Sequence, residues 1–373
     1  MGQHGRRAAA SAFGESPVSP SAAVAVFTSG TDGYHTFRIP ALLVLGDDQL
    51  LAFAEARWDG AADYGEIDLV QRRSEDGGRT WGQLDVIRHW AGYTCGNPAP
   101  VRTAAGDLVL LSMTNAATAT EDDILGGRVT AEQGRRVWVQ RSSDLGRSWT
   151  DPTEITDAVS RPGWRWYATG PAHGIQLESG RIVVPANHSE PTGNGEQVYT
   201  AHAVLSDDGG HTWRLGFVAR PRRGIEPNES GVTELPGGRL LFLSRNEADV
   251  LSHQRLVALS SSGGETLDRP FTTRTGLAGT KAQASVTYLP GQGLLATVVL
   301  RGPDRGDLEL RVSSSQGRRW RRALSVWPGP AGYCDVSADG DTLLLLFEAG
   351  REDPYEGIRL ARIDAADLVR PAR

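Results

Sequence analysis

The eight residues SEDGGRTW, Ser74–Trp81, decide the fold, because variants of them recur along the chain. The shared pattern is Ser-x-Asp-x-Gly-x-Thr-Trp. The Asp can accept hydrogen bonds from nearby backbone amides, the Gly can adopt a positive φ, and the Trp can fill the space between two sheets. We therefore interpret each copy, called a cassette below, as a structural turn rather than a metal site. The further copies are SSDLGRSW from Ser142, SDDGGHTW from Ser206, SSSQGRRW from Ser313 and a fainter SSSGGETL from Ser260.

A second repeat precedes the cassettes. Six times, an apolar run meets a glycine-bearing turn and re-emerges as another apolar run, which predicts a β-hairpin. A third alternating run follows most hairpins and leads into a cassette. The hairpins begin at Ala41, Val101, Gly174, Val232, Val286 and Asp335.

Six units of about four strands, without a helical period, predict an all-β protein and specifically a six-bladed β-propeller. A large β-sandwich is the alternative, but it gives no reason for a turn to recur at regular intervals. We expect a flexible lead-in over residues 1–25 and a single propeller domain over residues 26–373.

Composition excludes several classes of protein. The 373 residues carry a formal net charge of −6 and no basic block, which argues against a nucleic-acid partner. No run approaches the roughly 18 apolar residues of a membrane span. The two cysteines, Cys95 and Cys334, are too few for a disulfide framework and belong to no metal or redox motif. We expect no cofactor and no metal.

The first residues do not predict a secretory signal, since polar residues and Pro17 interrupt any apolar core. The sequence as given therefore indicates a cytoplasmic protein. A secreted protein whose signal has been removed is the alternative.

Polar residues gather at one predicted rim of the propeller. In an up-and-down blade, the residues before each first strand and after each second strand share one face, and the cassettes lie on the opposite face. Arginines, acids and a tyrosine converging there are typical of a hydrolytic site for an anion. Those residues are Arg38, Arg57, Asp63, Glu229, Arg245, Arg301, Tyr333 and Glu348.

These motifs resemble the bacterial exo-α-sialidases, or neuraminidases. FRIP, from Phe37, precedes several cassettes of the kind called Asp-boxes or BNR repeats, and the similarity runs from there to Gly350. Two features depart from the family pattern: Cys334 follows the tyrosine where a small hydroxyl residue is common, and the Ser313 cassette lacks its Asp and Thr.

The resemblance implies a role for each rim residue. Asp63 would be the general acid, with Asp59 and Asp68 as alternatives. Tyr333 and Glu229 would be the nucleophile and its base, and Glu348 would brace the first arginine of a substrate-binding triad. That triad would be Arg38, Arg245 and Arg305, with Arg301 or Arg311 as alternatives to Arg305 and with Arg57 as a further substrate contact.

The chemistry of sialic acid fits this set. Its anomeric carbon carries a carboxylate, which guanidinium groups bind through charge-assisted hydrogen bonds. That carboxylate would repel an anionic nucleophile, whereas a tyrosine is neutral, and sialidases are known for using one. With a pKa near 10, the tyrosine needs a neighbouring base.

We therefore expect an exo-α-sialidase that releases terminal sialic acid from glycoconjugates with retention of configuration. A trans-sialidase or an enzyme forming anhydro-sialic acid would need the same residues. A non-catalytic sialic-acid-binding propeller would need the arginines, but not Tyr333, Glu229 and Asp63 together.

Overall fold

The strands of the chain follow the hairpins expected from the sequence. A computed structural model describes residues 23–251, 253–283, 285–302 and 305–369. The all-β prediction is confirmed, since the described helices are only the short α1, α2 and α3 (Glu121–Leu125, Thr156–Val159 and Ala365–Val369). Residues 1–22 of the expected lead-in lie outside the described residues, and β1 already begins at Val24.

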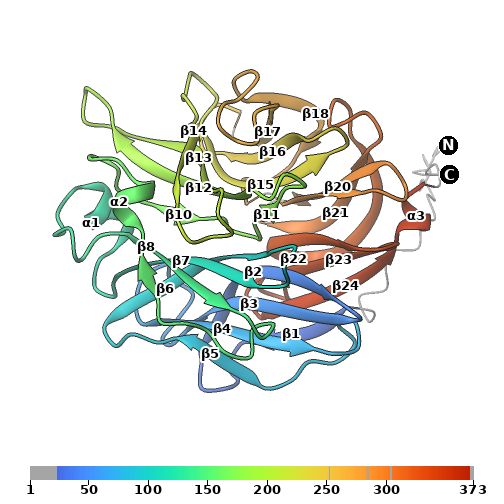
Figure 1. The fold of residues 1–373 in the computed structure, drawn as a ribbon, viewed down its shortest axis with the longest axis horizontal. Helices are drawn as coiled ribbons and strands as arrows, with labels where there is room; N and C mark the ends of the chain where they lie inside the picture. The colour runs from blue at the N-terminus through green and yellow to red at the C-terminus, as the bar shows by residue number, and fades with distance from the viewer. Residues whose placement is uncertain (1–22, 252, 284, 303–304, 370–373) are drawn as a thin grey trace, which may run out of the picture.

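Consecutive strands pair antiparallel in groups, which we call meanders (Figure 1). The first meander comprises β2 (Thr36–Gly46), β3 (Gln49–Arg57), β4 (Ile67–Ser74) and β5 (Leu84–Arg88). The second comprises β6 (Tyr93–Arg102), β7 (Leu108–Ala116), β8 (Arg136–Ser142) and β9 (Thr153–Glu154). One parallel pair, Ile67 with Thr94, joins these two meanders into an eight-stranded sheet.

The third and fourth meanders form separate sheets. The third contains the short β10 (Ala168–Thr169) and β11 (Ile175–Gln176), which both pair with β12 (Ile182–Pro191), followed by β13 (Gln197–Ser206) and β14 (Arg214–Val218). The fourth comprises β15 (Pro227–Leu235), β16 (Arg239–Asn246), β17 (Gln254–Ser260) and β18 (Thr272–Ala278).

One long strand links the last two meanders. β22 (Arg321–Asp339) pairs through its first half with β21 (Gly306–Ser313), which follows β19 (Val286–Leu289) and β20 (Leu294–Gly302). Its second half pairs with β23 (Thr342–Ala349), which pairs with β24 (Gly357–Asp364). β1 (Val24–Thr28) completes this sheet beside β24, so strands from the two ends of the described chain are neighbours.

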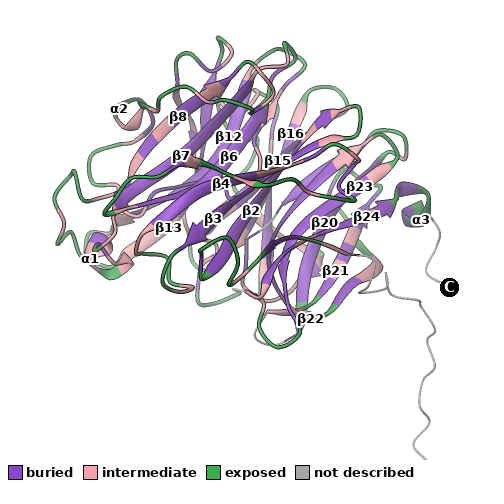
Figure 2. Cartoon of the chain, turned by 90° about the horizontal axis from the view of Figure 1, so that it is seen from below, coloured by how far each residue is buried: buried purple, intermediate pink, exposed green. Residues whose placement is uncertain are grey.

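Apolar side chains fill the space between adjacent meanders. Leu42 and Leu50 of the first meander pack with Leu344 and Leu346 of β23, and all four are fully buried. The second strands are buried along almost their whole length, as Figure 2 shows, which explains why they read as continuous apolar runs rather than as alternating ones.

A buried carboxylate joins the meanders near the middle of the molecule. Asp335 accepts hydrogen bonds from the backbone N–H of Leu42 (2.8 Å), the backbone N–H of His173 (3.1 Å) and the Ser285 hydroxyl (2.9 Å). The His173 ring contacts the same carboxylate at 2.8 Å. His173 therefore has a structural role.

Candidate active site

A β-bulge interrupts several first strands at the same end of the molecule. The pairing register shifts between Arg38 and Ala41 in β2, between Pro227 and Ser230 in β15, and between Ala331 and Cys334 in β22. A bulge bends the strand and re-aims a side chain. The expected site residues Arg38, Glu229 and Tyr333 lie at or within these bulges.

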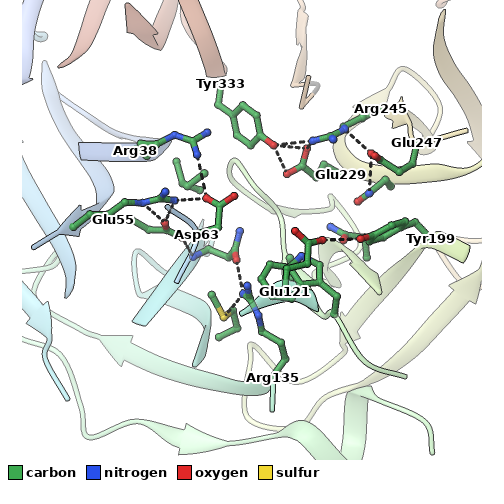
Figure 3. Close-up of a pocket in the computed structure, with 18 of the residues that line it drawn as sticks. Arg38, Glu55, Asp63, Glu121, Arg135, Tyr199, Glu229, Arg245, Glu247 and Tyr333 are labelled. Carbon is green, nitrogen blue, oxygen red and sulfur yellow. Dashed lines mark hydrogen bonds and ion pairs between the residues drawn. The ribbon is translucent and has the colours of Figure 1, made fainter. Parts of the chain in front are cut away.

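The re-aimed side chains line one pocket of about 280 Å³, drawn in Figure 3. Of the eight residues to which the family resemblance gives a first-choice role, seven line it, and the eighth, Glu348, contacts Arg38 and the backbone of Tyr333. The expected residues in its wall are Arg38, Arg57, Asp63, Glu229, Arg245, Arg305 and Tyr333.

The Tyr333 hydroxyl lies between a carboxylate and a guanidinium group. It donates to the Glu229 carboxylate at 2.8 Å and accepts from Arg245 Nη1 at 2.9 Å. Arg245 Nη1 is also 2.9 Å from Glu229 Oε2. Burial and the nearby Glu229 charge raise the pKa of Tyr333 well above its usual value, while Arg245, Arg305 and Arg38 oppose that rise. The tyrosine is therefore protonated, with its proton directed at Glu229.

Two further arginines approach the Tyr333 ring. The guanidinium carbons of Arg38 and Arg305 lie 5.3 and 5.2 Å from the ring centroid. Glu348, fully buried, accepts from Arg38 Nε (3.2 Å) and from the backbone N–H of Tyr333 (2.9 Å). Glu348 thus orients both residues at once. Arg305 Nη1 donates to the hydroxyl of Tyr355 at 2.9 Å.

Asp63 lies in the connection between β3 and β4, with 54% of its side chain exposed. Its Oδ1 is 3.0 Å from Arg38 Nη1 and 2.7 Å from Arg57 Nη2. Burial favours the neutral acid, but the charges of Arg57 and Arg38 outweigh it and lower the pKa of Asp63. The carboxylate is therefore ionised while these two contacts last.

Arg57 is more enclosed than expected of a substrate contact. Only 2% of it is exposed, and its guanidinium donates to Glu55, to Asp63 and to the carbonyls of Ala61 and Ala62. These bonds anchor the loop that carries Asp63. Because the Arg57 donors are engaged within the protein, we infer that Arg57 positions Asp63 rather than binding substrate directly.

The alternatives left open by the sequence lie elsewhere. Arg301 donates to the carbonyl of Ala278, and Arg311 pairs with Glu309. Asp59 is exposed, and Asp68 is buried against Tyr34, Trp58 and His89. None of these four residues lines the pocket.

Sequence reasoning missed part of the wall. Asn97 occupies the bulge of β6 (between Gly96 and Ala99), and its place just before the hairpin expected from Val101 was a signal. Glu247 follows Arg245 by two residues and pairs with its Nε at 2.7 Å. Glu121, Arg135 and Trp166 come from irregular connections, where no strand pattern marks them.

The cassettes lie away from the pocket. In the first one, Asp76 accepts from the backbone of Arg79 (3.0 Å) and Thr80 (2.9 Å), and the Gly77 N–H donates to Asp48 in the β2–β3 turn. That turn is at the end of β2 opposite to Arg38. Among the described residues, no cluster of three or more His, Cys, Asp or Glu side chains is arranged to hold a metal ion.

Comparison with known proteins assigns the chain to a family. The model of the BNR repeat-like domain matches residues 48–346. The sialidase of Micromonospora viridifaciens is 30% identical over 352 residues, which cover 89% of this chain and 53% of that protein. The chain belongs to the sialidase (BNR repeat) family. Named members of this family are glycoside hydrolases, and this chain spans about half of the Micromonospora sialidase.

Solved structures of the family share the fold. The Hadza microbial sialidase Hz136 superposes with a TM-score of 0.81 at 23% identity, over 93% of this chain and 69% of that one. The intramolecular trans-sialidase from Ruminococcus gnavus gives a TM-score of 0.76 at 17% identity, over 93% and 99%. In the part of this chain that is described, no helix has the length and apolarity to cross a membrane.

Proposed function

We propose that this protein is an exo-α-sialidase that hydrolyses terminal sialic acid from glycoconjugates with retention, using Tyr333 as nucleophile. The observation that carries the proposal is the Tyr333 hydroxyl, held at 2.8 Å from Glu229 and 2.9 Å from Arg245 inside a pocket rich in arginine. A pocket that only bound a sugar would not need this pair.

The sialic acid carboxylate binds to Arg38, Arg245 and Arg305. The three guanidinium groups surround Tyr333, so a carboxylate bound among them holds the anomeric carbon beside the phenol oxygen. Planar guanidinium groups suit a carboxylate because they donate two parallel hydrogen bonds. Glu348 keeps Arg38 in place for this contact.

The first chemical step forms a bond between the Tyr333 oxygen and the anomeric carbon, while the bond from that carbon to the leaving oxygen breaks. Glu229 takes the phenol proton, and Asp63 gives a proton to the leaving oxygen. In the second step, water attacks the anomeric carbon and the bond from that carbon to the Tyr333 oxygen breaks. Asp63 takes a proton from the water, and Glu229 returns its proton to the tyrosine. Two displacements at one carbon retain its configuration.

Asp63 must be protonated before it can act as the acid. In the structure, Arg38 and Arg57 hold it as a carboxylate. A substrate carboxylate that pairs with Arg38 weakens that stabilisation. The pKa of Asp63 then rises toward the range in which it can donate.

A closed six-bladed propeller is the arrangement we propose for the scaffold. Six meanders and the pairing of β1 with β24 support it, because that pairing ties the first described strand to the last. The ring would bring the bulged ends of its first strands to one opening, where a terminal sugar of a sialylated glycan can enter.

The test follows the sugar released from an aryl α-sialoside by NMR. We expect α-sialic acid to appear first and to mutarotate later. We also expect Tyr333→Phe to lower kcat/KM by roughly 10³-fold or more with an unchanged Tm, and the matched variant Tyr288→Phe, outside the pocket, to keep full activity. First release of the β-anomer would contradict a retaining mechanism, and 2,7-anhydro-sialic acid or a transferred sugar would show the alternative reaction.

A further inference from the structure

A fourth arginine lies across the pocket from Tyr333. Arg135 directly precedes β8, and its side chain reaches the wall opposite the tyrosine in Figure 3. It is 9% exposed. The proposed chemistry at Tyr333, Glu229 and Asp63 makes no use of it.

Arg135 has no acidic partner within ion-pair distance among the described residues. Its Nη1 donates to Asn97 Oδ1 at 3.2 Å and lies against the Met113 sulfur, and its buried Nε has no hydrogen-bond partner. A buried charge without a direct counterion is costly. A ligand that accepts hydrogen bonds would offset that cost.

Arg135 also covers apolar surface on this wall. Its guanidinium carbon lies only 3.5 Å from the centroid of the Trp166 ring. One face of the indole is therefore covered by a cation and unavailable to a ligand. The Met113 sulfur is covered by the same group.

The neighbouring wall accepts hydrogen bonds. Glu121, the first residue of α1, bonds through Oε1 to the Tyr199 hydroxyl at 2.6 Å, and both side chains line the pocket. Burial raises the pKa of Glu121 and lowers that of Arg135 to about 10, so Arg135 keeps its charge at neutral pH. A ligand group here meets a donor on one side and a carboxyl group on the other.

We propose that Arg135 and Glu121 form a subsite for a ring hydroxyl, so that the preferred substrate is a nonulosonic acid with a hydroxyl where common sialic acids carry an acylamino group. A hydroxyl accepts from Arg135 and donates to Glu121. An acetamido group adds a methyl, which would meet the guanidinium that covers Trp166 and would desolvate that charge. The inference rests on the proposed sialidase function.

The direct test compares two aryl glycosides that differ only in this substituent. We expect the wild-type kcat/KM for the hydroxyl substrate to exceed that for the acetamido substrate by about tenfold or more, because the added methyl would lie against a buried guanidinium. Preference for the acetamido substrate would overturn the subsite.

Two variants test whether Arg135 causes the preference for the hydroxyl substrate. Arg135→Met uncovers Trp166 and should reduce the substrate ratio by about tenfold or more, mostly by slowing the hydroxyl substrate. Arg136→Met is the matched control, since Arg136 pairs with Glu154 and does not line the pocket. An unchanged ratio in folded Arg135→Met would refute the assignment to Arg135.

Calorimetric binding of the two free sugar acids separates this inference from the proposed function. If neither glycoside is hydrolysed, the sialidase proposal fails, yet tighter binding of the hydroxyl acid would still support the subsite. Equal or weaker binding of that acid by the wild type would overturn it, and this measurement needs no variant to fold.

Discussion

Asp63 pairs with two arginines, so Asp63→Ala could remove either a general acid or a group that positions Arg38 and Arg57. Two substrates distinguish these roles. If Asp63 protonates the leaving oxygen, Asp63→Ala should slow a natural sialoside by about 10²-fold or more, since general acid catalysis contributes roughly 10²–10⁴-fold. An aryl sialoside, whose phenolate departs unaided, should retain far more activity. Measuring kcat/KM on both substrates checks this.

Asp59→Ala is the matched control for that experiment, because Asp59 lies in the same loop but is exposed and outside the pocket. Its activity should be unchanged on both substrates. Equal loss on the two substrates in Asp63→Ala would argue instead for a positioning role through Arg38 and Arg57.

At the residue scale, the sequence could identify side chains at strand ends because a strand fixes their direction. Arg38, Glu229 and Tyr333 follow from that rule together with the family resemblance. Arg135 and Glu121 could not be found this way, since they come from the connection between β7 and β8, where no repeating pattern relates sequence position to direction.

At the element scale, the cassettes form repeated turns with a common hydrogen-bond pattern. Asp208 bonds to the backbone N–H of Thr212 (2.9 Å) as Asp76 bonds to that of Thr80 (2.9 Å), and the serine hydroxyl bonds to the glycine N–H in both. The local spacing alone determines this geometry. The sequence could therefore predict the turn and its separation from the pocket.

Trp213 is the cassette tryptophan whose loss should be most visible. It is 6% exposed, packs with Val109 and Val204, and does not line the pocket. Trp213→Ala should lower the free energy of unfolding by about 3–5 kcal/mol while kcat/KM of the folded fraction stays unchanged. Denaturant unfolding and an activity assay measure the two effects separately.

Trp90→Ala serves as the control, since Trp90 is 39% exposed and stacks on Tyr93 at the surface. It should cost much less stability. Loss of turnover in fully folded Trp213→Ala would mean that packing at the cassette face affects the geometry of the pocket.

At the scale of the whole molecule, the sequence could predict six strand groups but not how neighbouring groups join. Two apolar runs around a glycine-bearing turn predict each hairpin locally. The parallel pair between Ile67 and Thr94 and the unbroken course of β22 depend instead on contacts between groups. Such contacts involve residues with no shared local pattern. For the same reason, no local pattern indicated that β1 begins at Val24 beside β24.

Phe27 tests how much the joining of the chain's first and last described strands matters. It is 1% exposed, belongs to β1 and lies against Phe37 of β2, with ring centroids 5.3 Å apart. Phe27→Ala should cost about 3–5 kcal/mol and lower the Tm of the whole molecule in one transition. A separate early transition confined to β1 and β24 would show instead that these two strands unfold alone.

A buried histidine pair should make the stability of the whole molecule depend on pH. His188 and His202 are fully buried, with their Nδ1 atoms 3.0 Å apart. Burial, with the nearby Arg161 charge, lowers the pKa of His202 to about 3, and burial with the His202 charge lowers that of His188 further. In the unfolded chain both titrate near 6.5.

Below pH 6.5 the unfolded chain therefore binds protons that the native histidine pair does not bind. The free energy of unfolding should decrease as the pH is lowered, by about 1.4 kcal/mol per pH unit for each histidine. His173 has a raised pKa, through Asp335, so its contribution is already complete below 6.5 and constant there. Urea unfolding between pH 4.5 and 6.5 measures the slope. The double variant His188→Gln/His202→Gln should flatten it, whereas exposed His211→Gln should not. An equal slope in all three proteins would assign the pH dependence to other groups.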